Sequence, residues 1–181
     1  MTHDTDPRAD DDAILAMTSR LTIRRLAATD VDALLAVYGD AESMRWVGDG
    51  RPLDRAACDE WIRVTERNYD TRGYGMSVIA DGGDGRVVGF VGLVHPGGQD
   101  TAELKYALLP EFRGRGLATE AARAMLVYGA TRFGLEEVIA TIAPENEASR
   151  RILEKLGMVE EAPRLDDDGL PTCVFRWRAD D

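Results

Sequence analysis

Residues 110–120 read PEFRGRGLATE, a glycine-rich stretch with two arginines that runs directly into a helical pattern. Apolar or aromatic side chains recur at helical spacing along this pattern, at Leu117, Ala121, Ala124, Met125 and Tyr128. The glycines therefore fall at the start of an amphipathic helix, where the first turn has unpaired N–H groups and a partial positive charge. Small residues let a ligand approach this backbone, and guanidinium groups add directional donors. The stretch predicts a phosphate-binding loop, although a solvated helix-capping turn would use the same residues.

A second informative segment, residues 144–158, reads PENEASRRILEKLGM. Asn146 stands where its helical pattern begins, a position that asparagine favours because its side-chain oxygen accepts a backbone N–H. Ser149 follows on nearly the same face, and Gly157 is placed to end the helix. These residues fit an N-cap and a small buried polar residue. They also fit ligand contacts at the edge of a cleft, since a capping asparagine still has an amide group to donate.

Together, the two segments resemble the paired motifs of the GNAT superfamily of N-acetyltransferases. Arg113, Gly116 and Ala118 match its Arg/Gln-x-x-Gly-x-Gly/Ala signature. Asn146 and Ser149 match the Asn-x-x-Ser of its ribosomal-protein (RimJ/RimL-like) branch. The resemblance implies a GNAT-like α/β fold with a mixed sheet. It also implies acetyl-CoA-dependent transfer of an acetyl group to a primary amine, by direct attack in a ternary complex.

The rest of the chain fits the element order β-α-α-β-β-β-α-β-α-β that this resemblance implies. Apolar runs, alternating or continuous, predict strands at residues 21–26, 76–80, 87–94, 101–109, 138–143 and 173–177. Two further helices are predicted, near residues 29–38 and 54–69. We expect one domain over residues 20–178, an acidic and mobile tail over residues 1–19, and a short C-terminal tail at residues 179–181.

The resemblance further implies which residues contact acetyl-CoA. Backbone N–H groups of residues 114–119 would hold the pyrophosphate, assisted by the side chains of Arg113 and Arg115. In relatives the preceding strand splays from its neighbour, and its free N–H groups, near Ala107 and Leu108 here, bind pantetheine and polarise the thioester carbonyl. The expected cofactor-binding residues are therefore Ala107, Leu108, Arg113, Gly114, Arg115, Gly116, Leu117, Ala118, Thr119 and Asn146.

The expected chemistry needs a base for the protonated amine and a donor for the leaving thiolate. Glu103 is the best-placed carboxylate, and with Tyr106 it matches the Glu-x-x-Tyr strand of the RimJ/RimL-like branch. An ordinary solvated glutamate, with a water relay as the base, explains Glu103 equally well. Many GNAT members carry a tyrosine seven residues after the helix-opening asparagine, where this chain has Leu153. Ser149 is then the nearest donor, with Asn146 orienting cofactor or water.

Charge and composition narrow the range of partners. The formal net charge of −11 argues against direct binding of nucleic acid and would attract a cationic acceptor. No apolar run is long enough for a membrane span and no secretion signal is found, so a cytoplasmic protein is expected. The two histidines and two cysteines form no metal-binding pattern, so no metal is expected.

The sequence thus predicts an N-acetyltransferase whose acceptor is a protein N-terminus or a small amine, acting as a monomer or homodimer. An alternative hypothesis keeps the fold without turnover: a sensor that binds acetyl-CoA, or a protein-interaction domain. Glu103, Asn146 and Ser149 favour the enzyme, because a degenerate site would not need them. Residues 39–75 contain no motif that identifies the acceptor, and the fold does not settle it.

Overall fold

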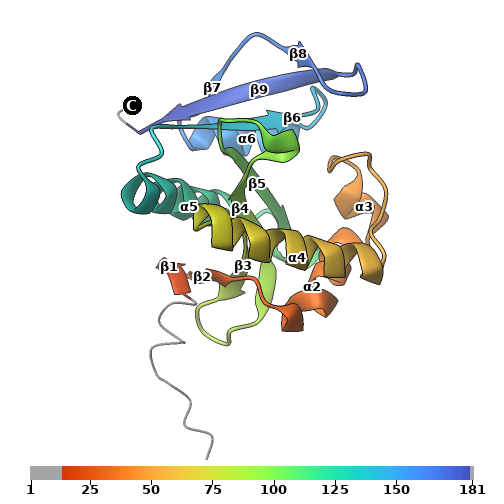
Figure 1. Cartoon of the computed structure of the whole chain (residues 1–181), viewed down its shortest axis with the longest axis vertical. Helices are drawn as coiled ribbons and strands as arrows, with labels where there is room; N and C mark the ends of the chain where they lie inside the picture. Colours follow the sequence, from red (N-terminus) through yellow and green to blue (C-terminus); the bar gives the residue numbers. More distant parts are fainter. Residues whose placement is uncertain (1–13, 180–181) are drawn as a thin grey trace, which may run out of the picture.

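The computed structural model describes residues 14–179, which form one mixed sheet with its covering helices (Figure 1). The strands are β1 (Ile14–Met17), β2 (Leu21–Arg25), β3 (Met76–Asp81), β4 (Val87–Val94), β5 (Glu103–Leu108), β6 (Glu137–Ile142), β7 (Val159–Glu160), β8 (Arg164–Leu165) and β9 (Pro171–Arg178). The α-helices are α2 (Val31–Tyr38), α3 (Ala41–Met44), α4 (Arg55–Arg72), α5 (Leu117–Phe133) and α6 (Glu147–Lys155). Strand order in the sheet is β1-β2-β3-β4-β5-β6-β9-β7, and β8 pairs with β9.

Each face of the sheet has its own apolar core. Helices α5 and α6 pack on one face, against residues such as Val91, Leu104 and Val138. Helices α2 and α4 pack on the other face, against Val78 and Phe90. Strand side chains alternate, so the even-numbered residues of β5 face α5 and α6 while its odd-numbered residues face α2 and α4. Strand β5 therefore contributes side chains to both sides of the molecule.

Helices α5 and α6 begin as the sequence predicts. The N-cap of α5 is Gly116, whose φ of 76° lies in the left-handed region that favours glycine, and the helix ends at Gly134 with φ 64°. Asn146 caps α6, and its side-chain oxygen accepts the backbone N–H of Ser149. The predicted N-cap at Asn146 is confirmed.

The sheet is split between β5 and β6. These parallel strands pair at Glu103 and Ile139, where the N–H of Ile139 donates to the carbonyl of Ala102 at 2.9 Å. No further pair joins the two strands along the described length of β5. On its other side β5 is fully paired with β4, from Glu103 to Leu108. The splay that the resemblance implied is therefore present, and it leaves the later part of β5 with one free edge.

The predicted elements occur in the predicted order, and the structure adds several short ones. Residues 14–17 form β1, an edge strand antiparallel to β2, so the tail predicted over residues 1–19 is wrong for its last part. Strand β1 is short, only partly buried and preceded by an acidic run, so no strand signal is evident in the sequence here. Residues 1–13 lie outside the described part of the chain. The N–H of Ala179 donates to Glu136, so residue 179 belongs to the fold rather than to a tail. Helix α3 and the short strands β7 and β8 were not predicted.

Candidate active site

The loop between β5 and α5 presents a row of backbone N–H groups. Gly114 and Gly116 both have positive φ, 73° and 76°, which turns the chain tightly into the helix. Within residues 14–179, no group accepts a hydrogen bond from the backbone N–H of any residue from 114 to 119. The next N–H, that of Glu120, donates to the carbonyl of Gly116 and starts the helical ladder. We call residues 114–119 the cradle, a concentration of free donors at the positive end of α5.

The two arginines of the loop have other partners in the structure. Arg113 donates from Nε to the carbonyl of Leu108 and from a terminal nitrogen to Ser43 Oγ at 2.7 Å, so its side chain ties α3 to the end of β5. The guanidinium of Arg115 lies 5.7 Å from the centre of the Phe112 ring and is exposed. Arg113 thus has partners in Ser43 and Leu108, and Arg115 lies near the cradle; that both side chains assist at the pyrophosphate stays a prediction.

Glu120 and Arg20 support the cradle from outside the predicted motif. Glu120, in the first turn of α5, accepts hydrogen bonds from Thr18 Oγ1 and from the backbone N–H and Nε of Arg20. Arg20 in turn donates to the carbonyl of Arg115 at 2.9 Å. Burial alone would raise the pKa of Glu120, but these hydrogen bonds and the charge of Arg20 lower it below its ordinary value. The turn between β1 and β2 is thereby fastened to the start of α5.

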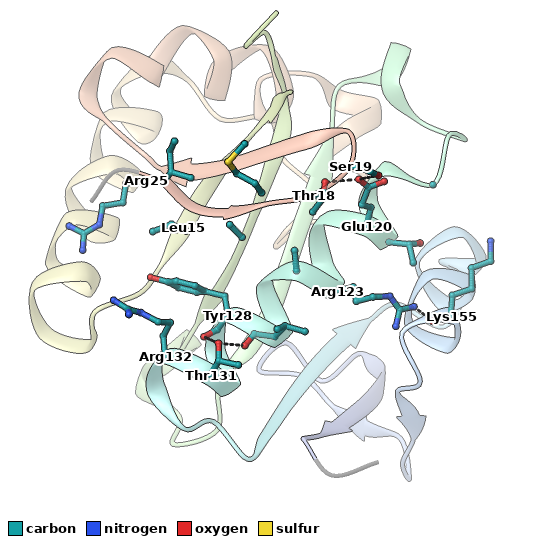
Figure 2. A pocket seen from close by; sticks show the side chains of 17 residues that line it. Leu15, Thr18, Ser19, Arg25, Glu120, Arg123, Tyr128, Thr131, Arg132 and Lys155 are labelled. Carbon is teal, nitrogen blue, oxygen red and sulfur yellow. Dashed lines mark hydrogen bonds between the residues drawn. The ribbon is translucent and has the colours of Figure 1, made fainter. Parts of the chain in front are cut away.

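A groove of about 1030 Å³ runs beside the cradle between β1 and α5 (Figure 2). Figure 2 shows Glu120, Arg123 and Tyr128 of α5 along one wall and Leu15 and Thr18 along the other. Gly116 and Thr119 line the groove as well, so it is continuous with the cradle. The end next to the cradle also holds Lys155, whose carbonyl accepts a hydrogen bond from Arg123 at 2.6 Å. Arg123 and Lys155 give this end positive charge, Arg25 and Arg132 line the groove as well, and no residue of β5 is part of the lining.

The free edge of β5 offers further backbone donors. The N–H of Leu109 donates to Val88 on β4, and N–H direction alternates along a strand, so the N–H of Ala107 also points to β4. The N–H groups of Tyr106 and Leu108 point the other way, toward the gap at β6. Of the two residues predicted to bind the thioester through their N–H groups, Leu108 is correctly oriented and Ala107 is not. The N–H at the free edge beside that of Leu108 belongs to Tyr106.

Asn146, Ser149 and Tyr106 meet on the face of the sheet that α5 and α6 cover. Asn146 is 8% exposed, and its side-chain NH2 has no hydrogen-bond partner among the described residues. Burial raises the pKa of Tyr106 to about 12, and the nearby Ser149 hydroxyl partly opposes this increase. That contact does not reach hydrogen-bond geometry: across residues 14–179, the Tyr106 hydroxyl is the one buried side-chain nitrogen or oxygen without a partner.

Glu103 lies on the opposite face of β5, in a buried polar cluster. Its side chain is 3% exposed. One carboxylate oxygen accepts from Lys105 Nζ and Thr141 Oγ1, and the other accepts from Gln99 Nε2 at 3.3 Å. Lys105 is 40% exposed, so the cluster opens toward solvent through the lysine. The prediction of a solvated glutamate is wrong: Glu103 is a buried carboxylate held by donors at the edge of the split.

The structure thus gathers the predicted residues into two groups on either side of β5. The cradle, Asn146 and Ser149 lie with α5 and α6, and Glu103 lies with α2 and α4. The split lies between them, so a ligand held at the free edge would be reached from both faces. Sequence reasoning missed the role of Arg20 and the ion pair of Lys105 with Glu103. The two-residue spacing of Lys105 and Glu103, which puts both on one face of a strand, was the available signal.

A helix start with free N–H groups beside a split mixed sheet is the arrangement expected of the N-acyltransferase fold. The chain belongs to the GNAT family of acetyltransferases, because the family model for the acetyltransferase (GNAT) domain matches residues 20–159. It is therefore an N-acetyltransferase of the family that uses acetyl-CoA.

Individual relatives and solved structures are consistent with this family assignment. The uncharacterized N-acetyltransferase YnaD of Bacillus subtilis (strain 168) is 28% identical over 144 residues, which cover 80% of this chain and 82% of that protein. The crystal structure of an acetyltransferase from Agrobacterium tumefaciens str. C58 matches with a TM-score of 0.76 at 28% identity, over 90% of this chain and 93% of that one. RimL, a ribosomal L7/L12 alpha-N-protein acetyltransferase solved with coenzyme A, shares the fold with a TM-score of 0.77 at 17% identity, over 92% and 98% of the two chains.

In residues 14–179, no helix is both long and apolar enough to span a membrane. Over the same range, no three His, Cys, Asp or Glu side chains come together in a way that could hold a metal ion.

Proposed function

We propose that this protein binds acetyl-CoA along the cradle and the free edge of β5 and transfers the acetyl group directly to a primary amine in a ternary complex. The observation that carries the proposal is the set of backbone donors in residues 114–119, together with those of Tyr106 and Leu108. Unpaired N–H groups at a helix start suit a pyrophosphate, and those at a strand edge suit an amide chain and a carbonyl oxygen.

The donor side of the site is assigned to the elements around α5. The cradle would hold the pyrophosphate, and Arg123 and Lys155 would place positive charge near the phosphate on the ribose. The N–H groups of Tyr106 and Leu108 would face pantetheine and the thioester oxygen, whose negative charge grows during attack. Asn146 would use its free NH2 to orient the cofactor or a water molecule. The cradle, the N–H groups of Tyr106 and Leu108 and the Asn146 NH2 fit the cofactor because each offers a donor without another described partner.

The acceptor side is assigned to the face that carries Glu103. A protonated amine cannot attack, so its proton must pass to Glu103 directly or through water. Lys105 Nζ donates a hydrogen bond to the Glu103 carboxylate in the structure. An incoming ammonium group would compete with Lys105 for this carboxylate. The formal charge of −11 favours a cationic acceptor. The acceptor classes proposed are a protein N-terminus and a small amine such as a polyamine.

Calorimetric titration with acetyl-CoA tests the donor side. The wild-type protein should bind acetyl-CoA, and Gly116→Trp should abolish binding by placing a large side chain at the cradle. Titration with AMP should give weaker binding, because AMP lacks the pyrophosphate and pantetheine. Absence of acetyl-CoA binding by the wild-type protein would refute the proposal.

Release of the coenzyme A thiol tests the acceptor side. We would compare polyamines with short peptides that have free N-termini, and use N-terminally blocked peptides as the matched control. Thiol release that depends on the free amine would identify the acceptor class. Binding of acetyl-CoA without release by any amine would refute transfer and support the sensor hypothesis.

A further inference from the structure

The hydroxyl of Tyr106 is buried without a hydrogen bond, and this is costly. A buried polar group without a partner loses its hydration and gains no hydrogen bond in return. This reduces the free energy of unfolding by about 1–3 kcal/mol. Across residues 14–179 it is the one buried side-chain nitrogen or oxygen in this condition. Native proteins satisfy nearly all such groups, so an exception calls for an explanation, and a ligand that supplies the partner is one.

The position of Tyr106 indicates where that ligand lies. Its backbone N–H points to the gap between β5 and β6, and its side chain lies on the face covered by α5 and α6. Ser149, at the start of α6, approaches the same hydroxyl. Leu153, one turn further along α6, is fully buried in the apolar core and offers no donor. The hydroxyls of Tyr106 and Ser149 therefore lie near each other on the α5 and α6 side of β5, the strand whose free edge is assigned to the thioester.

We propose that the Tyr106 hydroxyl, which lies beside Ser149, donates a hydrogen bond to the sulfur of coenzyme A and stabilises the leaving thiolate without transferring its proton. The inference rests on the proposed binding of acetyl-CoA, and deepens it by naming the group that contacts the sulfur. Tyr106 is then a catalytic residue that no part of the family motif around Asn146 supplies.

The acidity of the two groups explains why the proton stays on Tyr106. Burial raises the pKa of Tyr106 to about 12, whereas a free thiol has a pKa of about 8.5. Transfer of a proton from the phenol to the thiolate is therefore uphill. A hydrogen bond from a neutral donor to a charged acceptor needs no transfer and is worth more than one between neutral groups.

The reaction step balances without proton donation by Tyr106. The amine nitrogen forms a bond to the thioester carbon, the carbon–sulfur bond breaks, and sulfur keeps the electron pair as a thiolate. The proton lost by the amine passes toward Glu103 or water on the other face of β5. The thiolate takes a proton from solvent after it leaves the site.

The first test compares coenzyme A with desulfo-coenzyme A, which lacks the sulfur, in binding to wild type and Tyr106→Phe. Wild type should prefer coenzyme A, and this preference should increase as the pH rises through the thiol pKa, because the thiolate is the form that is stabilised. Tyr106→Phe should lose about 10- to 100-fold of that preference and its pH dependence, while its affinity for desulfo-coenzyme A stays unchanged. Acetyl transfer should slow by a similar factor at every pH.

Tyr74→Phe is the matched control. Tyr74 packs against the far end of α5, and its hydroxyl makes a 2.8 Å hydrogen bond with Nε2 of His95. This variant should lose stability and keep the preference for coenzyme A. Tyr106→Phe keeps the ring, removes an unpaired hydroxyl and should raise Tm by about 2–12 °C. A purely structural hydroxyl would give a lower Tm and an unchanged preference.

The outcomes separate the two proposals. If wild type binds neither coenzyme A nor acetyl-CoA, the proposed function fails and the role of Tyr106 fails with it. If wild type binds both but Tyr106→Phe retains the preference for coenzyme A over desulfo-coenzyme A, the role of Tyr106 is wrong and the proposed function stands. Loss of the preference in Tyr106→Phe alone supports the role of Tyr106.

Discussion

Alanine substitutions at the two ends of α5 separate backbone strain from ligand binding. Gly116 and Gly134 cap the same helix, and both have left-handed φ, 76° and 64°. A Cβ at Gly116 would come no closer than 3.7 Å to Arg20 Nη2, and one at Gly134 would meet nothing within 4 Å. Neither Gly116→Ala nor Gly134→Ala therefore causes a clash. Both variants carry the same penalty for a left-handed alanine, and only Gly116 belongs to the cradle.

The cost of a left-handed alanine sets the expected change in Tm and in acetyl-CoA affinity. A left-handed conformation costs a residue other than glycine about 1–2 kcal/mol, and in a domain of this size that lowers Tm by roughly 2–8 °C. Both variants should show this loss. Gly116→Ala can relieve the strain if residue 116 leaves the left-handed conformation. Binding of acetyl-CoA must then restore that conformation. The same 1–2 kcal/mol should weaken acetyl-CoA binding by about 5- to 30-fold in Gly116→Ala and leave Gly134→Ala at the wild-type affinity.

Thermal unfolding and calorimetric titration on the same samples provide the assay. Equal weakening of acetyl-CoA binding in the two variants would mean that α5 transmits strain along its length, and the argument for a local cradle would be wrong. Unchanged Tm in both variants would mean that the left-handed conformation is absent from the protein in solution. Either result would contradict the reasoning from φ and space.

Three further substitutions test other parts of the structure. Glu103→Gln should lower the rate of acetyl transfer by about 10²- to 10⁴-fold and leave acetyl-CoA affinity unchanged, since Glu103 faces away from the cradle; a normal rate in steady-state assays would exclude it as the base. Glu120→Ala should reduce the free energy of unfolding by about 1–3 kcal/mol in urea denaturation, because Thr18 and Arg20 lose their acceptor. Burial alone would raise the pKa of Asp30, but hydrogen bonds from Arg24 and from the backbone hold this pKa below 3.8. Its stabilising contribution is present above pH 3.8 and is lost as pH falls through the lowered value, so Asp30→Asn should flatten the acid side of a plot of Tm against pH.

Local sequence signals were enough to predict the cradle and the caps. Glycines before a helical pattern and an asparagine at the start of another have local physical causes, and the structure places both as expected. The direction of an N–H group along β5 depends on its pairing with β4, which no local pattern reveals, so the sequence alone does not tell which residues near 107 have N–H groups at the free edge. The partners of Arg113 and Glu103 come from distant segments, Ser43 and Thr141, and could not be inferred from spacing.

The split between β5 and β6 separates the residues proposed for the acceptor from most of those proposed for acetyl-CoA along the chain. Residues before the split supply Glu103 and the face on which an acceptor would dock, while α5, β6 and α6 after it supply most of the surface proposed for the donor. Strand β5 belongs to both, with alternate side chains turned to each. A change of acceptor in a descendant protein would therefore need substitutions mainly in α2, α3 and α4. The machinery proposed for acetyl-CoA could pass through such a change almost untouched.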